Sequence, residues 1–227
     1  MEFQREELMI DDINVLREKT VLVLGLGGVG GYVTESLARC GIGNLILVDY
    51  DVVDITNINR QIIALHSNIG KKKTDCFKKR INDINPNCKV KTLDIFYGEE
   101  NKEIVFDEKI DYIIDCCDSL ESKKILIEES FKRNIPIVSS MGTGNKFHPE
   151  LFSITKLKKT EYDPLAKKLR FLLKDQKELL ETDVLYSKEQ PHPYKGKIGS
   201  ISYVPSVAGL LLTSFVVNKF LNKWIFY

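Results

Sequence analysis

A glycine cluster, GLGGVG at residues 25–30, constrains this chain more than any other feature. It follows a short β-branched run at Thr20–Leu24 and precedes apolar residues that recur at helical spacing. This order predicts a strand, a tight glycine turn and a helix, with room for a phosphate group against the backbone N–H groups at the helix N-terminus. The glycines expected to form this turn are Gly25, Gly27, Gly28 and Gly30.

The remainder of the first 140 residues alternates between strand and helix signals. Runs at 44–49, 110–115 and 135–139 are apolar with little polar alternation, which is typical of parallel strands covered on both faces, and 89–95 is also expected to form a strand. Helical spacing follows Gly70 and Ser119, and the Ser119 hydroxyl is suited to capping the second of these helices. The alternation predicts an α/β fold with a Rossmann-like, doubly wound and largely parallel sheet.

The pattern changes after Gly144. Residues 151–155 are expected to form an antiparallel strand, a helix begins at Asp163-Pro164 and buries leucines, 183–186 forms a further strand, and a polar loop reaches residue 200. We therefore expect antiparallel strands to extend the sheet in the C-terminal half. The leucines expected to be buried are Leu165, Leu169, Leu172 and Leu173. A single domain over 1–227 is predicted, with a nucleotide-binding half at about 1–141 and a substrate-side half at about 142–227.

Composition excludes several classes of protein. A formal net charge of +1 gives no global attraction to nucleic acid or membrane, and five cysteines without a CxxC pair argue against a disulfide framework or structural zinc. Residues 1–12 are charged where an export signal would be apolar, which favours a cytoplasmic protein. The apolar stretch 204–217 is shorter than a membrane span, so a buried helix is expected rather than stable membrane insertion, with apposition to a membrane surface as the alternative.

Asp49 ends the second predicted strand, about 20 residues after the glycine cluster, where a carboxylate accepts ribose hydroxyls in Rossmann folds. A dehydrogenase that binds NAD would share this arrangement. The residues that follow point instead to phosphoryl chemistry, because a guanidinium suits phosphate oxygens and neighbouring amides suit their orientation. These residues are Asp51, Thr56, Asn57, Arg60 and Gln61. For Arg60 alone, a helix cap with a salt bridge explains the pattern equally well.

Lys71, Lys72 and Lys73 follow Gly70 and are predicted to occupy the first turn of a helix. The helix dipole disfavours cations there unless an anion is bound. A triphosphate resolves this conflict, and Lys73 is the lysine predicted to reach it, while Lys71 and Lys72 are expected to be solvated.

Asp118 and Ser119 follow the predicted strand at 110–115, at the sheet edge where such folds bind ligands. Asp118 is a candidate ligand of Mg²⁺, and capping of the next helix is a compatible second role. Cys116 and Cys117 stand beside this position without a paired histidine, so core packing is favoured over nucleophilic catalysis.

These motifs together resemble the ThiF/MoeB/HesA branch of the ubiquitin-activating superfamily. The resemblance implies that Asp49 and Asp51 serve the ribose and metal-phosphate region, that Asp118 holds magnesium, and that ATP and Mg²⁺ are bound. The phosphates would be contacted by Asn57, Arg60 and Lys73. It also implies a homodimer in which an N-terminal arginine, here Arg5, crosses into the partner's site.

The second half, with GTGNKFHP at 142–149 and KTEYDPLA at 159–166, is similar to the tRNA threonylcarbamoyladenosine dehydratases. In that family ATP activates the carboxylate of the threonylcarbamoyl group on a tRNA adenosine, and an intramolecular attack closes a ring with loss of water. The alternative enzyme is an adenylyltransferase for the C-terminus of a sulfur-carrier or ubiquitin-like protein, with a sulfur-carrier or cysteine-desulfurase-type protein as partner. The non-enzymatic alternative is a nucleotide-binding sensor.

Local charge gives some support for a tRNA partner. Between residues 156 and 177 the chain carries eight basic and three acidic residues, a patch that is able to meet phosphates. A solvated helix face is the alternative explanation of the same residues.

Overall fold

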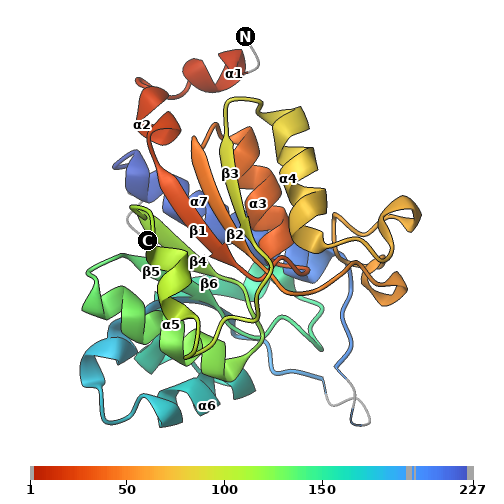
Figure 1. Ribbon diagram of the computed structural model, residues 1–227. Helices are drawn as coiled ribbons and strands as arrows, with labels where there is room; N and C mark the ends of the chain where they lie inside the picture. Colours follow the sequence, from red (N-terminus) through yellow and green to blue (C-terminus); the bar gives the residue numbers. More distant parts are fainter. Residues whose placement is uncertain (1–2, 193–195, 197, 224–227) are drawn as a thin grey trace.

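The computed structural model describes residues 3–192, 196 and 198–223 (Figure 1). Within these residues seven strands form one sheet in the order β3-β2-β1-β4-β5-β7-β6. The strands are β1 Thr20–Leu24, β2 Asn44–Val48, β3 Lys89–Leu93, β4 Tyr112–Asp115, β5 Ile137–Ser140, β6 Phe152–Lys156 and β7 Asp183–Ser187. All of them run parallel except β6, which pairs antiparallel with β7 at the edge. The prediction of an α/β, Rossmann-like fold is confirmed. Strand β7 pairs parallel with β5, so β6 is the one strand of this sheet that runs in the opposite direction.

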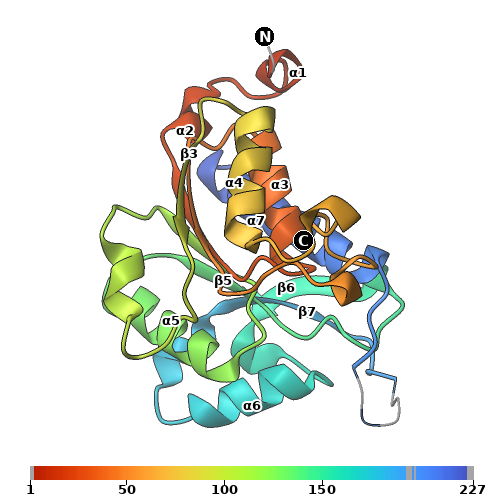
Figure 2. The same cartoon turned by 45° about the vertical axis from the view of Figure 1, so that its right-hand side comes forward.

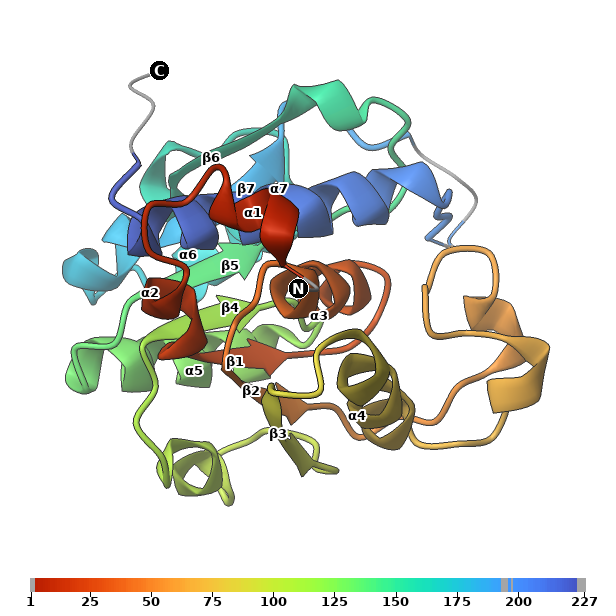
Figure 3. The same ribbon diagram turned by 90° about the horizontal axis from the view of Figure 1, so that it is seen from above.

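Helices cover both faces of the sheet, as Figures 2 and 3 show. Helices α3, α4 and α7 share one hydrophobic core with the sheet, and α5 and α6 share the other. The helices are α1 Gln4–Glu7, α2 Asn14–Arg17, α3 Gly30–Arg39, α4 Lys73–Ile84, α5 Leu120–Lys132, α6 Pro164–Leu172 and α7 Tyr203–Phe220. Single 3₁₀ turns lie at Ile55–Asn57, His66–Asn68, Lys102–Phe106, Pro149–Leu151, Leu157–Lys159 and Lys177–Glu181.

Two helix starts follow the predicted chemistry. The Ser119 hydroxyl accepts a hydrogen bond from Ser122 N at 3.2 Å, and the Asp163 carboxylate accepts one from Ala166 N at 2.9 Å. Of the four leucines expected to be buried here, Leu169 and Leu173 are buried and Leu165 is half-buried, but Leu172 is exposed, so the expectation for Leu172 was wrong. The apolar stripe of this short helix is narrow, and Leu172 projects beyond its edge.

Helix α7 packs along α3, and Gly209 makes this close contact possible. A Cβ atom at Gly209 would lie 2.5 Å from the Val29 carbonyl oxygen, so the two helix backbones approach more closely than any side chain allows. Of the helices described, α7 is the one long and apolar enough to cross a membrane by length and composition, a test that core helices of soluble proteins also pass. Its face toward α3 is buried as predicted, whereas Leu210 and Leu211 are exposed.

Candidate nucleotide and acceptor site

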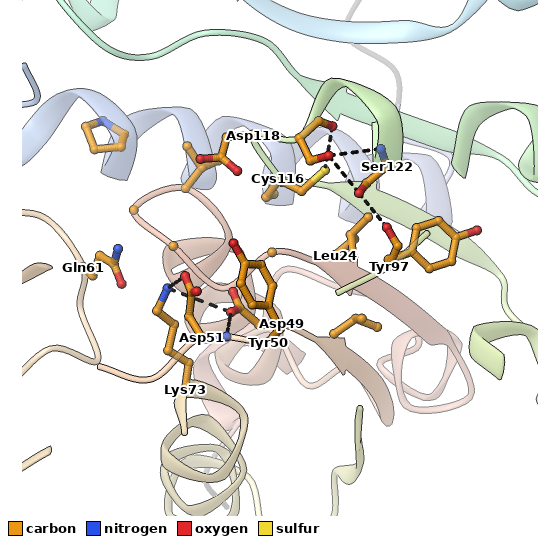
Figure 4. Close-up of a pocket in the computed structure, with 18 of the residues that line it drawn as sticks. Leu24, Asp49, Tyr50, Asp51, Gln61, Lys73, Tyr97, Cys116, Asp118 and Ser122 are labelled. Atoms are coloured by element: carbon orange, nitrogen blue, oxygen red, sulfur yellow. Dashed lines mark hydrogen bonds and ion pairs between the residues drawn. The ribbon is translucent and has the colours of Figure 1, made fainter. Parts of the chain in front are cut away.

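A cavity of about 320 Å³ opens at the carboxyl ends of β1, β2 and β4 (Figure 4). Its wall is formed by the glycine turn, the segment after β2, the loop at 57–61, Lys73 and the turn after β4. Thr143, Ser200 and Pro205 close it from the second half of the chain. In open α/β sheets this edge is where ligands bind, so the cavity is the candidate site.

The glycine turn touches the turn after β4, and this contact explains two of its glycines. Gly25 has a φ of 87°, and a Cβ atom there would lie 2.8 Å from Cys117 N. A Cβ atom at Gly30 would lie 1.8 Å from the Gly25 carbonyl oxygen. Gly25, Gly27 and Gly28 line the cavity, but Gly30 does not. Gly30 therefore serves the tightness of the turn rather than direct approach of a phosphate.

Asp49, Asp51 and Lys73 form a charged cluster on the cavity wall. The Asp49 carboxylate accepts hydrogen bonds from Leu26 N at 2.6 Å and Asp51 N at 2.8 Å. Lys73 Nζ lies 2.7 Å from Asp51 Oδ2 and 3.9 Å from Asp49 Oδ1. Burial raises the pKa of Asp49, although Lys73 and the two N–H donors oppose that shift. The cluster thus presents a buried ammonium beside two carboxylates on the cavity wall, and the contact of Lys73 with a triphosphate stays a prediction.

The three lysines after Gly70 do not share the first turn of a helix, so that prediction was wrong. Helix α4 begins at Lys73, and Lys72 is extended because it forms a β-bridge with Val52. Lys72 Nζ pairs with Asp94 Oδ2 at 2.5 Å, whereas Lys71 is exposed. Lys73 alone therefore occupies the first turn, where the helix dipole and the cavity meet.

The loop at 54–61 divides into a capping unit and a cavity-facing part. Asp54 and Asn57 cap the 3₁₀ turn reciprocally, and the Thr56 hydroxyl donates to Asp54 Oδ1 at 2.6 Å. Thr56 is absent from the cavity wall, which contains Asn57, Arg60 and Gln61. Arg60 Nη1 donates to the Thr56 carbonyl at 2.8 Å, so Thr56 orients Arg60 through its backbone. The geometry therefore does not support the predicted direct contact between Thr56 and the nucleotide.

In the part of the chain that the structure describes, Gln61 places a hydrogen-bond acceptor without a partner in the cavity wall. Its side chain is buried, and within the described residues its Oε1 atom has no hydrogen-bond partner. A buried polar atom without a partner is costly, and a ligand donor in the cavity would satisfy it.

Asp118 lies across the cavity from Lys73 and Asp51 (Figure 4). Ser119 also lines the cavity while capping α5, so both predicted residues belong to this site. Among the described residues no three His, Cys, Asp or Glu side chains gather as a metal cage. A cation such as Mg²⁺ commonly uses one or two carboxylates together with phosphates, and Asp118 and Asp51 fit that donor set.

A buried ion pair beneath the cavity was not predicted. Lys123 Nζ lies 2.9 Å from Asp115 Oδ2 and donates to the Ser140 carbonyl at 2.8 Å, and neither charged side chain is exposed. Ser139 Oγ also donates to Asp115 at 2.5 Å. Burial alone would lower the pKa of Lys123, but the attraction of Asp115 raises it above its usual value. A lysine on the apolar face of the predicted α5 was the available signal.

The other Asp115 oxygen accepts a hydrogen bond from Cys117 N at 3.1 Å, so the pair fixes the turn that carries Asp118. Burial raises the pKa of both the Cys116 and the Cys117 thiols. Thiols that stay protonated are poor nucleophiles, in agreement with the expected packing role.

Arg5 lies outside this site. It is exposed on α1, near the amino-terminal end of β1, while the cavity opens at the opposite end of the strands (Figure 1). Within one chain it does not join the other predicted residues.

The basic stretch at 156–177 is partly neutralised. Lys156 pairs with Asp183 at 2.6 Å, Lys158 pairs with Glu181, and Arg170 donates to the Thr160 carbonyl. The lysines of this stretch without an ion pair among the described residues are Lys159, Lys167, Lys168, Lys174 and Lys177. The local positive charge is therefore smaller than the residue count implied.

The sequence profile of the ThiF family matches residues 4–221. This chain belongs to the ThiF family. It is 42% identical to the tRNA threonylcarbamoyladenosine dehydratase of Bacillus subtilis, with 97% of this chain and 95% of that protein aligned. The dehydratase of the same name from Haemophilus influenzae is 33% identical, covering 94% of this chain and 90% of that protein.

A solved structure extends the comparison of this ThiF-family chain to three dimensions. The Escherichia coli tRNA N6-threonylcarbamoyladenosine dehydratase, TcdA, in complex with ATP superimposes with a TM-score of 0.92 at 34% identity, covering 98% of this chain and 94% of that one. Similarity to a ubiquitin-like modifier-activating enzyme of Caenorhabditis elegans covers only 51% of this chain. The two dehydratases therefore match more of this chain than the modifier-activating enzyme does.

Proposed function

We propose that this ThiF-family protein adenylates a carboxylate with ATP, and that the carboxylate is the threonylcarbamoyl group of a modified adenosine in tRNA. The observation that carries the proposal is the single cavity in which the glycine turn, Asp49 and the Lys73–Asp51 pair converge. The named dehydratases that match nearly the whole chain support the choice of acceptor.

The cavity wall suits each part of the nucleotide. Asp49 is held by two backbone N–H groups and would accept a ribose hydroxyl. The backbone of Gly27 and Gly28 leaves room for phosphate oxygens, and Lys73 and Arg60 supply positive charge to them. Asp118 would hold Mg²⁺, which neutralises phosphate charge when bound, and Asp51 lines the same cavity.

The proposed reaction has two steps with balanced atoms. An oxygen of the acceptor carboxylate attacks the α-phosphorus of ATP, and the bond to the bridging oxygen breaks as pyrophosphate leaves. A nucleophile within the same threonylcarbamoyl group then attacks the activated carbonyl carbon, loses its proton and expels AMP. The nucleoside thereby loses one water, whose oxygen leaves with AMP. The role of Lys73 and Arg60 is to stabilise charge that develops on the phosphates.

The proposal includes a homodimer in a cytoplasmic setting, without stable membrane insertion. Arg5 lies far from the cavity of its own chain, so a phosphate contact by this residue requires the cavity of a second copy. An Arg5→Ala variant that is fully active would contradict this part of the proposal. Mixing inactive Arg5→Ala and Lys73→Ala chains should restore about a quarter of the activity if their subunits exchange at random, since one intact site then forms in half of the dimers.

Nucleoside mass spectrometry tests the main proposal. Wild-type protein is incubated with MgATP and tRNA that carries threonylcarbamoyladenosine, and Lys73→Ala serves as the control. The expected result is loss of one water from that nucleoside, release of AMP and pyrophosphate, and no change with Lys73→Ala. An unchanged nucleoside with wild-type protein that binds ATP would contradict the proposed acceptor.

A second candidate is activation of the C-terminus of a sulfur-carrier or ubiquitin-like protein, with a cysteine-desulfurase-type protein as a further partner. The similarity to modifier-activating enzymes favours it, although over only half of the chain. Pyrophosphate exchange that depends on a carrier protein, and is absent with tRNA, would select this alternative. ATP binding without turnover on either acceptor would instead indicate a sensor.

A further inference from the structure

A second buried ion pair lies next to the part of the cavity wall that comes from the second half of the chain. Lys146 Nζ lies 3.3 Å from Asp163 Oδ2, with the two side chains 1% and 0% exposed. Both side chains bond to the backbone of Gly142. The Gly142 N–H donates a hydrogen bond to the Asp163 carboxylate at 3.1 Å, and the Gly142 carbonyl accepts one from Lys146 Nζ at 2.8 Å. The next residue, Thr143, lines the cavity. The pair therefore fixes the start of α6 directly against the cavity wall.

Tyr162 stands immediately before Asp163, at this junction. Its backbone φ is 56°, in the left-handed region that a bulky side chain rarely adopts. The residue is nevertheless 58% exposed, so burial of the ring does not account for its position. The bonds made by Asp163 to Gly142, Lys146 and Ala166 hold the neighbouring backbone in place. Strained residues that persist in this way cluster at ligand-binding sites.

The surroundings of Tyr162 favour a polyanion. Lys159 precedes it and Lys167 and Lys168 follow it on α6, all exposed and without an ion pair among the described side chains. Glu161 is the exposed acidic neighbour, so the balance of these exposed charges remains positive. An exposed aromatic residue in a basic segment is a combination by which proteins bind single-stranded RNA, since bases stack on the ring and phosphates meet the cations.

We propose that Tyr162 is an acceptor-recognition residue, whose ring stacks on an unpaired nucleobase of the RNA beside the nucleotide that enters the cavity. Lys146 and Asp163 are positioning residues, which fix the backbone next to Tyr162 against Gly142, the neighbour of Thr143. This inference rests on the proposed function, because it requires RNA as the acceptor. It adds a contact outside the nucleotide site, on the rim formed by the second half of the chain.

Three variants distinguish the effect of the Tyr162 ring from the effect of its backbone conformation. Tyr162→Asn removes the ring but tolerates the left-handed conformation, and Tyr162→Phe keeps the ring. Phe171→Ala is the matched control, because Phe171 is 67% exposed near the end of α6 and does not adjoin Asp163. Steady-state KM for tRNA, ATP affinity and thermal midpoint are measured for each variant beside the wild type.

Loss of one base stack should raise the KM for tRNA about tenfold in Tyr162→Asn, with ATP affinity and thermal midpoint close to wild type. Tyr162→Phe and Phe171→Ala should retain the wild-type KM. A wild-type KM in Tyr162→Asn, or an equal rise in Phe171→Ala, would overturn the inference while the proposed function stands. No dehydration by the wild type would overturn both, and a KM effect seen only with a carrier protein would replace RNA by a protein acceptor.

Discussion

Lys73 and Lys123 are both buried helix lysines paired with an aspartate near the carboxyl end of a strand, yet they differ in what surrounds the pair. The Lys73 side chain is 4% exposed, but its partner Asp51 is 45% exposed and faces the cavity. Lys123 and Asp115 are both fully enclosed. One pair therefore borders a space that a ligand can enter, and the other is sealed by protein.

This difference separates a site residue from a structural one. At the cavity, Lys73 can exchange part of its interaction with Asp51 for a phosphate oxygen, and Asp51 is then free to face a cation. Lys123 has no such alternative, because its hydrogen bonds to Asp115, Ser139 and Ser140 are all internal. Burial of charge alone thus does not identify function, whereas burial beside an accessible cavity does.

Lys123→Met should have the largest effect. It leaves Asp115 charged and buried without its cation, which should lower the free energy of unfolding by about 3–5 kcal/mol. Urea unfolding followed by circular dichroism measures this change. The double variant Asp115→Leu/Lys123→Met removes both charges and should recover part of the loss. A Lys123→Met protein as stable as the wild type would mean that the sealed pair does not support the fold.

Lys73→Met should act mainly on catalysis. Its partner Asp51 is 45% exposed and Asp49 keeps its two backbone N–H donors, so the loss of stability should be smaller than that of Lys123→Met. Loss of one preorganised charge at the phosphates should reduce turnover by about 10²–10³-fold. Quenched-flow measurement of AMP formation, with unfolding measured in parallel, separates the two effects. Destabilisation equal to that of Lys123→Met would remove the distinction drawn between the pairs.

The sequence predicted the parts of this molecule that depend on local chemistry. Thr20–Leu24 is a strand as expected, and Ser119 and Asp163 cap their helices, because apolar runs and capping side chains act over a few residues. The buried ion pairs of Lys123 and Lys146 were not predicted, because their partners are separated from them in sequence and come into contact only in the folded protein. Lys72 was misassigned for a related reason, as its bridge to Val52 and bond to Asp94 are tertiary contacts.

Asp118→Ala tests whether a residue on the opposite wall of the cavity also acts on catalysis without supporting the fold. Asp118 is exposed and its side chain makes no hydrogen bond or ion pair with the described residues, so its removal should leave the thermal midpoint unchanged. Adenylation should fall about a hundredfold if the carboxylate places a cation at the phosphates. Titration with Mg²⁺ tests the cause, because a lost ligand shifts the half-saturating concentration upward. A rate loss with an unchanged Mg²⁺ dependence would assign Asp118 a role other than metal binding.

Thr56→Ala should have the smallest effect, and it tests whether the distinction reaches residues just behind the cavity wall. The hydroxyl of Thr56 bonds only to Asp54 within the described structure, whereas Arg60 uses its backbone carbonyl, which alanine retains. Stability should fall by about 0.5–1.5 kcal/mol, the worth of one hydrogen bond, while KM for ATP changes less than about twofold. Arg60→Ala, measured beside it, should raise that KM because it removes the cavity-facing guanidinium itself. A large rise in KM with Thr56→Ala would return the hydroxyl to the nucleotide site that the sequence predicted for it.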